Sequence, residues 1–437
     1  MKFGVLGKSL PHTYSPQIHK AFADYEYTVL ERTEEQVHAL FEGAEGLDGF
    51  NVTIPYKKLA ASLCTELSDE VRELGAANTI VRLPDGGYKG YNTDVYGFTY
   101  MLESAGIEAA GKRCLVLGTG GASVAVEYAL KKMGAAKIDF CSRSGAINYE
   151  NVYEVAADTQ IVVNATPVGM FPNVDDSPVD LSRFSKLYAA ADIVYNPSRT
   201  RFLQQAQQLG VKNAGGLSML VAQAWEASRI FMLLEVVSTG STTTEKSSTT
   251  TKKSSTTTEK SSNTIEAVIE KLQDQMLNVT LIGMPGCGKT TLGKKLASQT
   301  NRTFIDLDDE FTKEYGETPA QIITQKGEDT FRSMETALAK KILSQSGLVI
   351  ATGGGIVTRT ENWFFLRANS RVIYIERPLD FLLKQNTDNR PLSQNNKIEE
   401  LYKTRTPLYE RVCDIKLENP GRDFVMAPFD IGSGTTK

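Results

Sequence analysis

The sequence predicts an α/β protein in two halves, and three observations lead to that prediction. First, short β-branched runs alternate with amphipathic helical stretches, a pattern typical of parallel sheets covered by helices on both faces. Second, residues 241–262 repeat a seven-residue unit of Ser, Thr, Lys and Glu without an apolar side chain, so they divide the chain and are expected to be disordered. Third, each half contains a glycine-rich turn between a strand and a helix.

Ten strands are expected, and the first half is expected to be subdivided near residue 100. In the first half the strands are Lys2–Leu6, Phe50–Ile54, Arg113–Leu117, Lys137–Cys141, Gln160–Asn164 and Asp192–Tyr195. In the second half they are Val279–Ile282, Thr303–Asp306, Leu348–Ala351 and Val372–Ile375. Between them lie stretches such as Ala122–Met133 and Thr291–Thr300, in which apolar residues recur at helical spacing.

Composition restricts the classes of function. Of the 437 residues, 41% are hydrophobic and 23% are charged, which is enough apolar material for sizeable cores. The net charge of −4 gives no reason to expect nucleic acid or an anionic membrane as a partner. The N-terminal sequence is unlike a signal peptide, and five scattered cysteines without a CxxC pair fit a reducing, cytoplasmic location.

The glycine-rich turn of the first half has the pattern of a dinucleotide-binding motif. The segment RCLVLGTGGAS leads from a strand through Gly118, Gly120 and Gly121 into a helix. Glycines there let the backbone approach a pyrophosphate at the helix N-terminus, although a purely structural turn is the alternative. After the next strand, Ser142 and Arg143 stand in place of the acidic residue that holds an NAD ribose, so the sequence favours NADP.

The glycine-rich turn of the second half is a P-loop. The segment VTLIGMPGCGKTT contains the pattern GxxxxGK[ST] as Gly283, Gly288, Lys289 and Thr290. Its N–H groups are expected to cradle phosphates, while Lys289 reaches the terminal phosphates and Thr290 binds Mg²⁺. A strand before the motif and a helix after it make a nucleotide-free glycine turn a weak alternative.

Two carboxylates follow the next strand. Asp306 and Asp308 are two residues apart, so on a strand both would point to the same side, next to the phosphates. One would support Mg²⁺ and the other would orient an attacking hydroxyl, with a helix-capping acidic cluster as the alternative. The glycines of ATGGG, residues 351–355, permit a ligand to approach the backbone. Three separate arginines could clamp anionic groups, although each alone suits a solvated surface: Arg332, Arg390 and Arg405.

The second half resembles shikimate kinases over nearly its whole length. The resemblance rests on GMPGCGKTT, DLD at 306–308, GEDTFRSME, ATGGG, NRPL and RTPLYERV. It implies a P-loop domain with a parallel sheet that phosphorylates the shikimate 3-hydroxyl with MgATP. The implied nucleotide contacts are Gly283, Gly286, Gly288, Lys289, Thr290, Thr291 and Arg390, with Thr290 and Asp306 at the metal. The implied shikimate contacts are Arg332, Gly354, Arg405 and Asp308, which would accept or orient the hydroxyl.

The first half resembles shikimate dehydrogenases. The resemblance rests on GKSLPHTYSP, FNVTIPYK, GAANTI, YNTD, LGTGGAS, NATPVGM, DIVYNP and GLSMLVAQA. It implies an α/β substrate domain and a Rossmann domain that together reduce 3-dehydroshikimate with NADPH, with Lys57 and Asp94 as the catalytic pair. The implied substrate contacts are Thr13, Ser15, Thr53, Asn78, Asp94, Tyr195 and Gln223. The implied NADP contacts are Gly118, Gly120, Gly121, Ala122, Ser142, Arg143 and Gly216.

The chemistry of the pair agrees with the resemblance. Reduction of a ketone needs a proton donor, and Lys57 beside a carboxylate suits that task, although alone each residue would be an ordinary surface group. The sequence departs from the two families in four places. Thr13 stands where many dehydrogenases have Ser, and CSRS at 141–144 replaces a typical Asn-Arg-Thr, so only Arg143 transfers with certainty. The kinase lid has only Arg390, and the C-terminus lacks the usual last helix.

These observations predict a bifunctional enzyme of the shikimate pathway that acts on small molecules. The alternative is a quinate/shikimate dehydrogenase fused to a weak or regulatory P-loop domain.

The expected domains are 1–100 for the substrate, 101–240 for NADP, 241–262 as a disordered insertion, 263–276 as the last dehydrogenase helix and 277–437 for the kinase. Residues 263–276 carry apolar side chains on one helical face behind Asn263 as a possible N-cap; an extension of the kinase is the alternative. These side chains are Ile265, Val268, Ile269, Leu272 and Met276.

Overall fold

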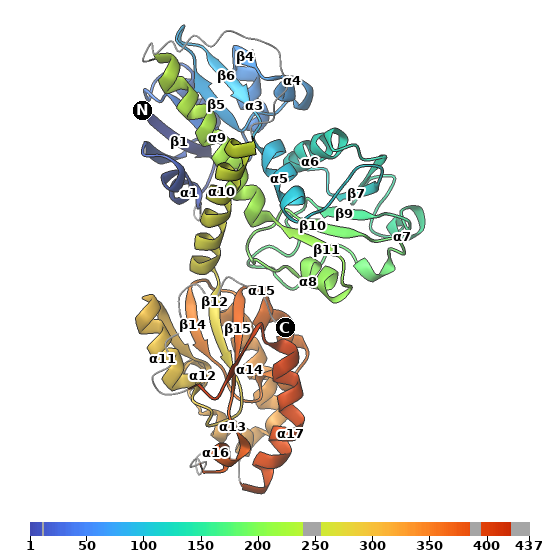
Figure 1. Ribbon diagram of the computed structural model, residues 1–437, viewed down its shortest axis with the longest axis vertical. Helices are drawn as coiled ribbons and strands as arrows, with labels where there is room; N and C mark the ends of the chain where they lie inside the picture. Colours follow the sequence, from blue (N-terminus) through green and yellow to red (C-terminus); the bar gives the residue numbers. More distant parts are fainter. Residues whose placement is uncertain (11–12, 239–254, 385–394, 421–437) are drawn as a thin grey trace. The chain divides into compact units, whose positions relative to one another are not determined.

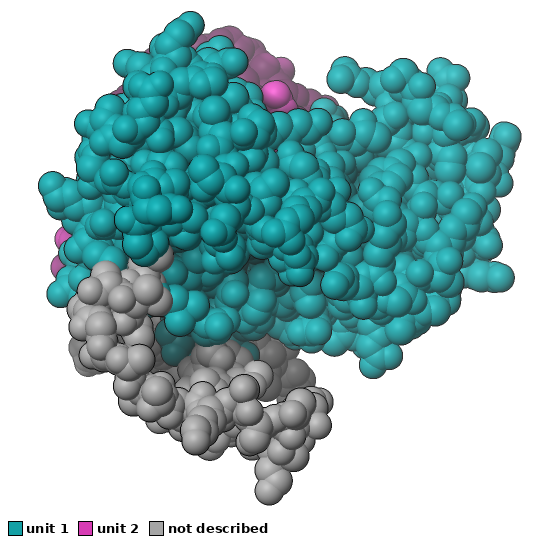
Figure 2. Space-filling view, turned by 90° about the horizontal axis from the view of Figure 1, so that it is seen from above, with its two compact units in different colours: residues 1–169, 176–195, 202–269 teal, residues 170–175, 196–201, 270–437 magenta. Residues whose placement is uncertain are grey.

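The computed structural model describes residues 1–10, 13–238, 255–384 and 395–420 (Figure 1). Two compact units divide the chain (Figure 2). The first comprises residues 1–169, 176–195 and 202–269, and the second comprises residues 170–175, 196–201 and 270–437. Helices and strands alternate in both units, which confirms the predicted α/β class. No helix within the described residues is long and apolar enough to cross a membrane.

The first sheet belongs to the first unit and has the strand order β2-β1-β3-β5-β6-β4. Its strands are β1 (Lys2–Gly7), β2 (Glu26–Glu31), β3 (Gly49–Val52), β4 (Glu66–Leu67), β5 (Thr79–Arg82) and β6 (Tyr88–Tyr91). Its helices are α1 (Ser15–Phe22), α2 (Glu34–Phe41), α3 (Lys57–Leu63) and α4 (Asp69–Leu74). Strand β1 pairs in parallel with β2 and β3, but β5 pairs antiparallel with β3 and β6. The prediction of parallel sheets is wrong here, because the short turn through PDGG joins β5 to β6 as a hairpin.

The second sheet is parallel throughout, as predicted, in the order β11-β10-β9-β7-β8. Its strands are β7 (Arg113–Leu117), β8 (Lys137–Cys141), β9 (Ile161–Asn164), β10 (Ala189–Asp192) and β11 (Lys212–Gly215). Around it lie α6 (Gly121–Lys132), α7 (Val152–Val155), the short helix η1 (Leu181–Arg183) and α8 (Arg201–Gln208). The strand expected at Asp192–Tyr195 was placed too late. Strand β10 is buried between two neighbours, where small alanine side chains fit and β-branched residues are not required.

Helices α5 (Asp94–Ser104) and α9 (Gly216–Ser238) cross closely in the first unit. A Cβ at Gly97 would lie 2.6 Å from the carbonyl oxygen of Met219, so a glycine permits this approach. The buried face of α5, including Phe98, packs into the core of the second sheet. The domain boundary expected near residue 100 thus falls inside α5, and the division into two domains there stays a prediction.

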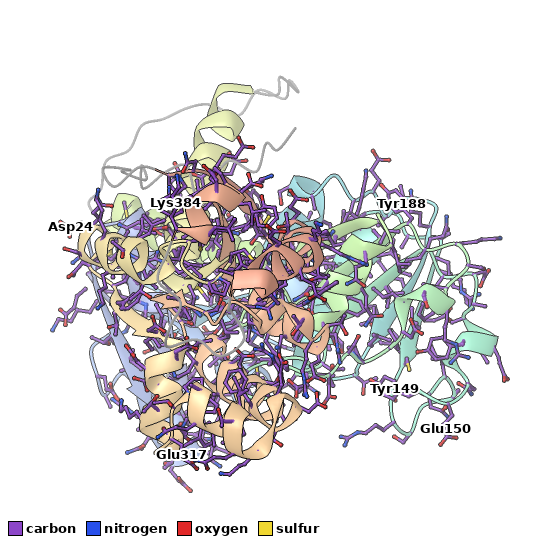
Figure 3. The ribbon with its side chains drawn as sticks, turned by 90° about the horizontal axis from the view of Figure 1, so that it is seen from below. Asp24, Tyr149, Glu150, Tyr188, Glu317 and Lys384 are labelled. Carbon is purple, nitrogen blue, oxygen red and sulfur yellow. The ribbon has the colours of Figure 1, made fainter. Side chains whose placement is uncertain are left out.

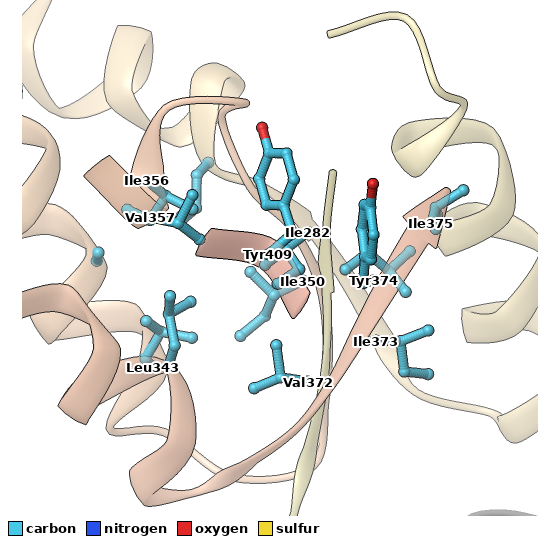
Figure 4. Packing of buried hydrophobic residues seen from close by; sticks show 14 of the residues in the cluster. Ile282, Leu343, Ile350, Ile356, Val357, Val372, Ile373, Tyr374, Ile375 and Tyr409 are labelled. Atoms are coloured by element: carbon cyan, nitrogen blue, oxygen red, sulfur yellow. The ribbon is translucent and has the colours of Figure 1, made fainter. Parts of the chain in front are cut away.

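The sheet of the second unit is parallel, as predicted, in the order β13-β14-β12-β15-β16. Its strands are β12 (Asn278–Ile282), β13 (Thr303–Asp306), β14 (Leu348–Ala351), β15 (Ser370–Glu376) and β16 (Ile415–Glu418). Its helices are α11 (Lys289–Thr300), α12 (Leu307–Tyr315), α13 (Pro319–Lys326), α14 (Glu328–Leu343), η2 (Ile356–Thr358), α15 (Glu361–Ala368), α16 (Leu379–Leu383) and α17 (Asn395–Val412). In its core the rings of Tyr374 and Tyr409 stack at 5.1 Å among Ile282, Ile350 and Val372 (Figure 4).

Helix α10 (Ser255–Met276) extends further toward the N-terminus than the sequence predicted. The expected disorder is wrong for residues 255–262, which belong to α10, while 241–254 lie outside the described residues. Asn263 is therefore inside the helix and is not its N-cap. Adding a residue to the end of an existing helix costs little free energy. The polar residues 255–262 can therefore extend a helix that is stabilised by the apolar face that follows them. Of that face, Ile265, Val268, Leu272 and Met276 are buried, and the two units divide after Ile269.

Replacing Ile265 with Ala is expected to destabilise the first unit, because the change leaves a cavity under α10. The expected loss is about 2–5 kcal/mol in the free energy of unfolding. Thermal unfolding followed by circular dichroism measures it, with the exposed Glu270→Ala as a control that should stay within about 0.5 kcal/mol. Equal unfolding temperatures for Ile265→Ala and the unaltered chain would show that α10 is not part of the folded core.

Candidate active sites

Charged side chains such as Asp24, Glu150 and Lys384 are exposed and project outward (Figure 3). Buried charges are exceptions, because a charge removed from water costs free energy unless a partner compensates it. Apart from a neutral histidine, the buried Asp, Glu, Lys and Arg residues among those described are Asp94, Asp192, Lys289, Arg332, Glu335 and Arg405. All six lie within the sequence motifs of the two halves. Such clusters of buried charge are typical of active sites.

The predicted catalytic pair of the first unit is assembled. Lys57 is the first residue of α3 and Asp94 the first residue of α5. The Nζ of Lys57 lies 2.6 Å from Oδ2 of Asp94, and the Oδ1 of that carboxylate accepts a hydrogen bond of 2.9 Å from Nδ2 of Asn78. The backbone N–H of Asp94 donates to Oδ1 of Asn92 at 3.2 Å. The two functional side chains thus have fixed positions relative to each other.

The other predicted substrate contacts lie in three places. Gln223, on α9, brings Oε1 to 3.5 Å from the hydroxyl of Thr93, next to the catalytic pair. Thr13 donates from its hydroxyl to that of Ser15 at 3.1 Å, and between them Tyr14 meets the ring of Tyr195 edge-on at 6.2 Å. Burial raises the pKa of Tyr195. Thr53 follows β3, and a Cβ at Gly7 would lie 2.9 Å from its methyl group.

The predicted NADP turn has space above its helix N-terminus. Gly118 has a φ of +96°, and an added Cβ there would lie 2.7 Å from Thr166. In contrast, an added Cβ at Gly120 or Gly121 would meet no atom within 4 Å. Ser123, which stands where the dinucleotide motif has a third glycine, donates from its hydroxyl to the carbonyl of Gly120 at 2.6 Å. The Ser123 side chain therefore stabilises the turn and does not fill the space above it.

The remaining predicted NADP contacts lie around this turn. Ala122 occupies the first turn of α6. Ser142 and the exposed Arg143 follow the end of β8, the neighbouring strand of the sheet. Gly216 begins α9, and a Cβ there would lie 2.1 Å from the carbonyl oxygen of Ile193, so only glycine fits. The exposed guanidinium of Arg143 is available to an anionic group of a ligand.

The P-loop follows β12 in the middle of its sheet. Its glycines all have positive φ angles: Gly283 at 146°, Gly286 at 80° and Gly288 at 98°. Lys289 is 9% exposed, and its Nζ donates to the carbonyl oxygens of Gly283 at 2.8 Å and Met284 at 3.0 Å. Thr290 and Thr291 follow in the first turn of α11. The loop thus has the conformation and the cation that a phosphate site requires.

The two carboxylates after β13 are arranged differently from the prediction. Asp306 ends the strand and caps α12, accepting the backbone N–H of Asp308 at 3.1 Å. Asp308 lies in the first turn of that helix, so the argument from a shared strand face is wrong, and the capping alternative holds for Asp306. The other oxygen of Asp306 accepts the hydroxyl of Thr290 at 2.7 Å. Hard oxygen donors of this kind suit Mg²⁺, although the described residues hold no cluster of three His, Cys, Asp or Glu side chains for a metal.

The predicted shikimate contacts gather at the ATGGG loop after β14. A Cβ at Gly355 would lie 2.1 Å from the guanidinium of Arg332, so the absence of a side chain lets this arginine cover the loop. Similarly, a Cβ at Gly353 would lie 2.6 Å from Oε1 of Glu335 and 3.3 Å from Oδ1 of Asp308. The loop therefore brings a cation together with Asp308, the carboxylate that is predicted to orient the hydroxyl.

Glu335 is a member of this group that the sequence analysis missed. Its Oε2 accepts from Nη1 of Arg332 at 2.6 Å, yet burial raises its pKa. Its position three residues after Arg332 on α14 is the signal that could have identified it. The hydroxyl of Tyr409 donates to the carbonyl of Gly354, and the buried Arg405 interacts with Tyr409. The predicted lid arginine Arg390 lies outside the described residues.

Comparisons with known proteins identify the families of the two halves. Family models match for the Shikimate dehydrogenase substrate binding domain over residues 5–80 and for Shikimate kinase over residues 285–424. A shikimate dehydrogenase (NADP(+)) from Caldicellulosiruptor bescii is 37% identical over 257 residues, which cover 53% of this chain and 88% of that protein. The chain belongs to the shikimate dehydrogenase family. A shikimate kinase domain follows the dehydrogenase in the same chain.

Solved structures lead to the same family. A shikimate dehydrogenase from Peptoclostridium difficile aligns with a TM-score of 0.51 and 32% identity, covering 62% of this chain and 98% of that one. A quinate dehydrogenase from Corynebacterium glutamicum in complex with NAD aligns with a TM-score of 0.50 and 29% identity, covering 54% of this chain and 94% of that one. Since both proteins share the fold of this dehydrogenase, the fold by itself does not decide the cofactor.

Replacing Gly120 with Ala tests whether the space above the turn accepts a dinucleotide. The unfolding temperature should not change, because the φ of −79° suits any residue and the new methyl group meets no atom. NADPH binding should weaken by about 1–3 kcal/mol, since the methyl group would crowd the pyrophosphate. NADPH fluorescence titration measures the Kd. An unchanged Kd would leave the turn a purely structural feature. In contrast, Gly118→Ala should lower the unfolding temperature.

Proposed function

We propose that this chain catalyses two consecutive reactions: NADPH-dependent reduction of 3-dehydroshikimate to shikimate, and transfer of a phosphate from MgATP to the 3-hydroxyl of shikimate. The observation that carries the proposal is that one chain brings together the predicted catalytic pair of the first reaction and several predicted groups of the second. Lys57 and Asp94 are paired at 2.6 Å, and Asp308 lies at the glycine loop that Arg332 covers. A dead or purely regulatory domain gives no reason to retain the buried Asp94 and Arg332 in these groups.

In the first reaction the chain supplies a proton and holds the substrate. NADPH, when bound, supplies the hydride to the carbonyl carbon. The Nζ of Lys57 donates a proton to the carbonyl oxygen as negative charge develops there. Asp94 keeps that amine in position and accepts a hydrogen bond from a substrate hydroxyl, while Asn78 and Gln223 border the same space.

In the second reaction the chain mainly positions two reactants, as phosphoryl transfer requires. The P-loop N–H groups and Lys289 bind the phosphates of ATP. Thr290 and Asp306 would hold Mg²⁺, which neutralises charge on the transferred phosphate. Asp308 orients the attacking hydroxyl, and the buried guanidiniums of Arg332 and Arg405 suit the carboxylate of shikimate, because they can bind it bidentately.

A two-step assay with matched variants tests the proposal. The unaltered chain should oxidise NADPH in the presence of 3-dehydroshikimate, and later addition of MgATP should release ADP. Lys57→Ala should lower the kcat of the first step by about 10²–10⁴-fold and leave phosphorylation of added shikimate intact. Asp308→Asn should impair only the second step, with ATP affinity retained through Lys289. Loss of ATP affinity in Asp308→Asn would instead make that residue a metal ligand.

The cofactor is expected to be NADP rather than NAD, because Arg143 stands where an NAD site has an acidic residue. Replacing Arg143 with Ala should raise the KM for NADPH by about tenfold or more, since a charge-assisted hydrogen bond to the 2′-phosphate is lost. The KM for NADH should stay nearly the same. An equal rise with both cofactors would contradict the assignment to the 2′-phosphate. Preference of the unaltered chain for NADH and quinate would favour the alternative function.

The proposed partners are the small-molecule substrates alone. Neither the net charge nor the two sites give a nucleic acid or a membrane a role. A cytoplasmic location and the boundaries of the domains stay predictions.

A further inference from the structure

The catalytic pair of the first unit continues into a buried chain of hydrogen bonds that begins at Tyr27, on β2. The hydroxyl of Tyr27 donates to Oδ1 of Asn51 at 2.7 Å. Nδ2 of Asn51 donates to the hydroxyl of Thr79 at 3.0 Å and to the backbone carbonyl of Asn78 at 3.3 Å. The hydroxyl of Thr79 lies 3.2 Å from Oδ1 of Asn78, whose Nδ2 reaches Asp94 at 2.9 Å. Tyr27, Asn51 and Thr79 are not among the predicted site residues.

Groups that can only donate or only accept fix the direction of this chain. The backbone N–H of Thr93 donates to Oδ1 of Asn78 at 2.7 Å, so Nδ2 of that amide must face the Asp94 carboxylate. The backbone carbonyl of Asn78 only accepts, so Asn51 presents Nδ2 to it and Oδ1 to the tyrosine hydroxyl. Since Thr79 accepts from Asn51, its own hydrogen points onward to Asn78 or to Thr93, 3.1 Å away. The side-chain hydrogen bonds from Tyr27 through Asn51, Thr79 and Asn78 can therefore all run in one direction, toward the Asp94 carboxylate.

Burial makes each of these bonds costly to lose. The exposed fractions are 0% for Thr79, 2% for Thr93, 3% for Asn78 and 7% for Asn51. Burial raises the pKa of Tyr27 well above its usual value, so its hydroxyl stays protonated and remains a donor. The ring of His19 stacks on Tyr27 at 4.1 Å, and burial lowers the pKa of His19 to about 3, so this ring is uncharged.

We propose that Tyr27 and Thr79 are positioning residues of the dehydrogenase: together with the backbone N–H of Thr93, they hold the amide of Asn78 in place, and this amide orients the Asp94 carboxylate and, through it, Nζ of Lys57. This inference rests on the proposed reduction of dehydroshikimate. Without the hydroxyl of Thr79, the Asn78 amide loses one of its hydrogen bonds and can shift, and the carboxylate that it orients shifts with it. The amine of Lys57 would then move with its partner, and small displacements of a proton donor lower the rate strongly.

The first test removes the hydroxyl of Thr79 and keeps its shape. Thr79→Val should lower the kcat for dehydroshikimate reduction by about tenfold, with a smaller change in KM, because the proton donor is misplaced while the substrate contacts persist. Thr79→Ser restores the hydroxyl and should recover kcat to within about threefold. Kinase activity and the unfolding temperature of the same chain verify that it folds. Equal kcat values for Thr79→Val and the unaltered chain would overturn the inference.

The second test compares Tyr27 with Tyr25, which immediately precedes β2. Tyr25 also has a partly buried ring beside His19, but its hydroxyl meets Nδ1 of that histidine at 2.7 Å and not the chain that leads to Asp94. Tyr27→Phe should lower kcat by roughly three- to tenfold, whereas Tyr25→Phe should change it by less than about twofold. Equal losses would assign the effect to packing of the aromatic rings and would overturn the inference. An unaltered chain that cannot reduce dehydroshikimate would instead overturn the proposed function itself.

Discussion

The cost of burying charge is the constraint on which both sites depend. A buried ion loses its hydration, and removal of one partner from a buried pair costs about 3–5 kcal/mol. Asp94 therefore has two partners, Lys57 and Asn78, on its two oxygens. In the second unit Arg332 is paired with Glu335 in the same way. Lys57, Asn78 and Glu335 thus hold the buried charges in place without a ligand, and the same contacts fix the position that we propose for the ligand.

Lys289 satisfies the same constraint differently, because it contacts only neutral acceptors of its own loop. Its ammonium group donates to the carbonyl oxygens of Gly283 and Met284 and lies 3.8 Å from Sγ of Cys287, and none of these neutral acceptors compensates the charge fully. A phosphate offers charged acceptors, and hydrogen bonds between charged groups are roughly twice as strong as neutral ones. The exchange of carbonyl contacts for phosphate contacts therefore favours nucleotide binding. At Glu335 the cost of burial outweighs the attraction of a charged partner, since burial raises the pKa of this carboxyl group even though Arg332 lies beside it.

Motifs predicted the local elements better than the ways in which they combine. Both glycine-rich turns could be predicted because glycine geometry fixes them locally, and the Lys57–Asp94 pair could be predicted only from the family resemblance, since it joins two helices. The strand β10 could not, since AAAD has no strand preference and owes its conformation to the two neighbouring strands. Asp308 was placed on a strand because spacing alone cannot show where α12 begins. Glu335 and Thr79 act through contacts to Arg332 and Asn78 that appear only when the chain is folded.

The folds place functional groups of both sites at the starts of helices that follow strands. Asp94 begins α5, Gly121 begins α6 and Lys289 begins α11, while Asp308 lies in the first turn of α12. In the two parallel sheets all strands end at one edge, so the helices that follow them begin along that edge. The N–H groups there have no partner within the helix and attract negative charge, whether it is a side-chain carboxylate or a bound phosphate. The predicted dinucleotide turn and the P-loop thus use the same backbone feature, whereas Asp94 begins a helix that follows the mixed first sheet.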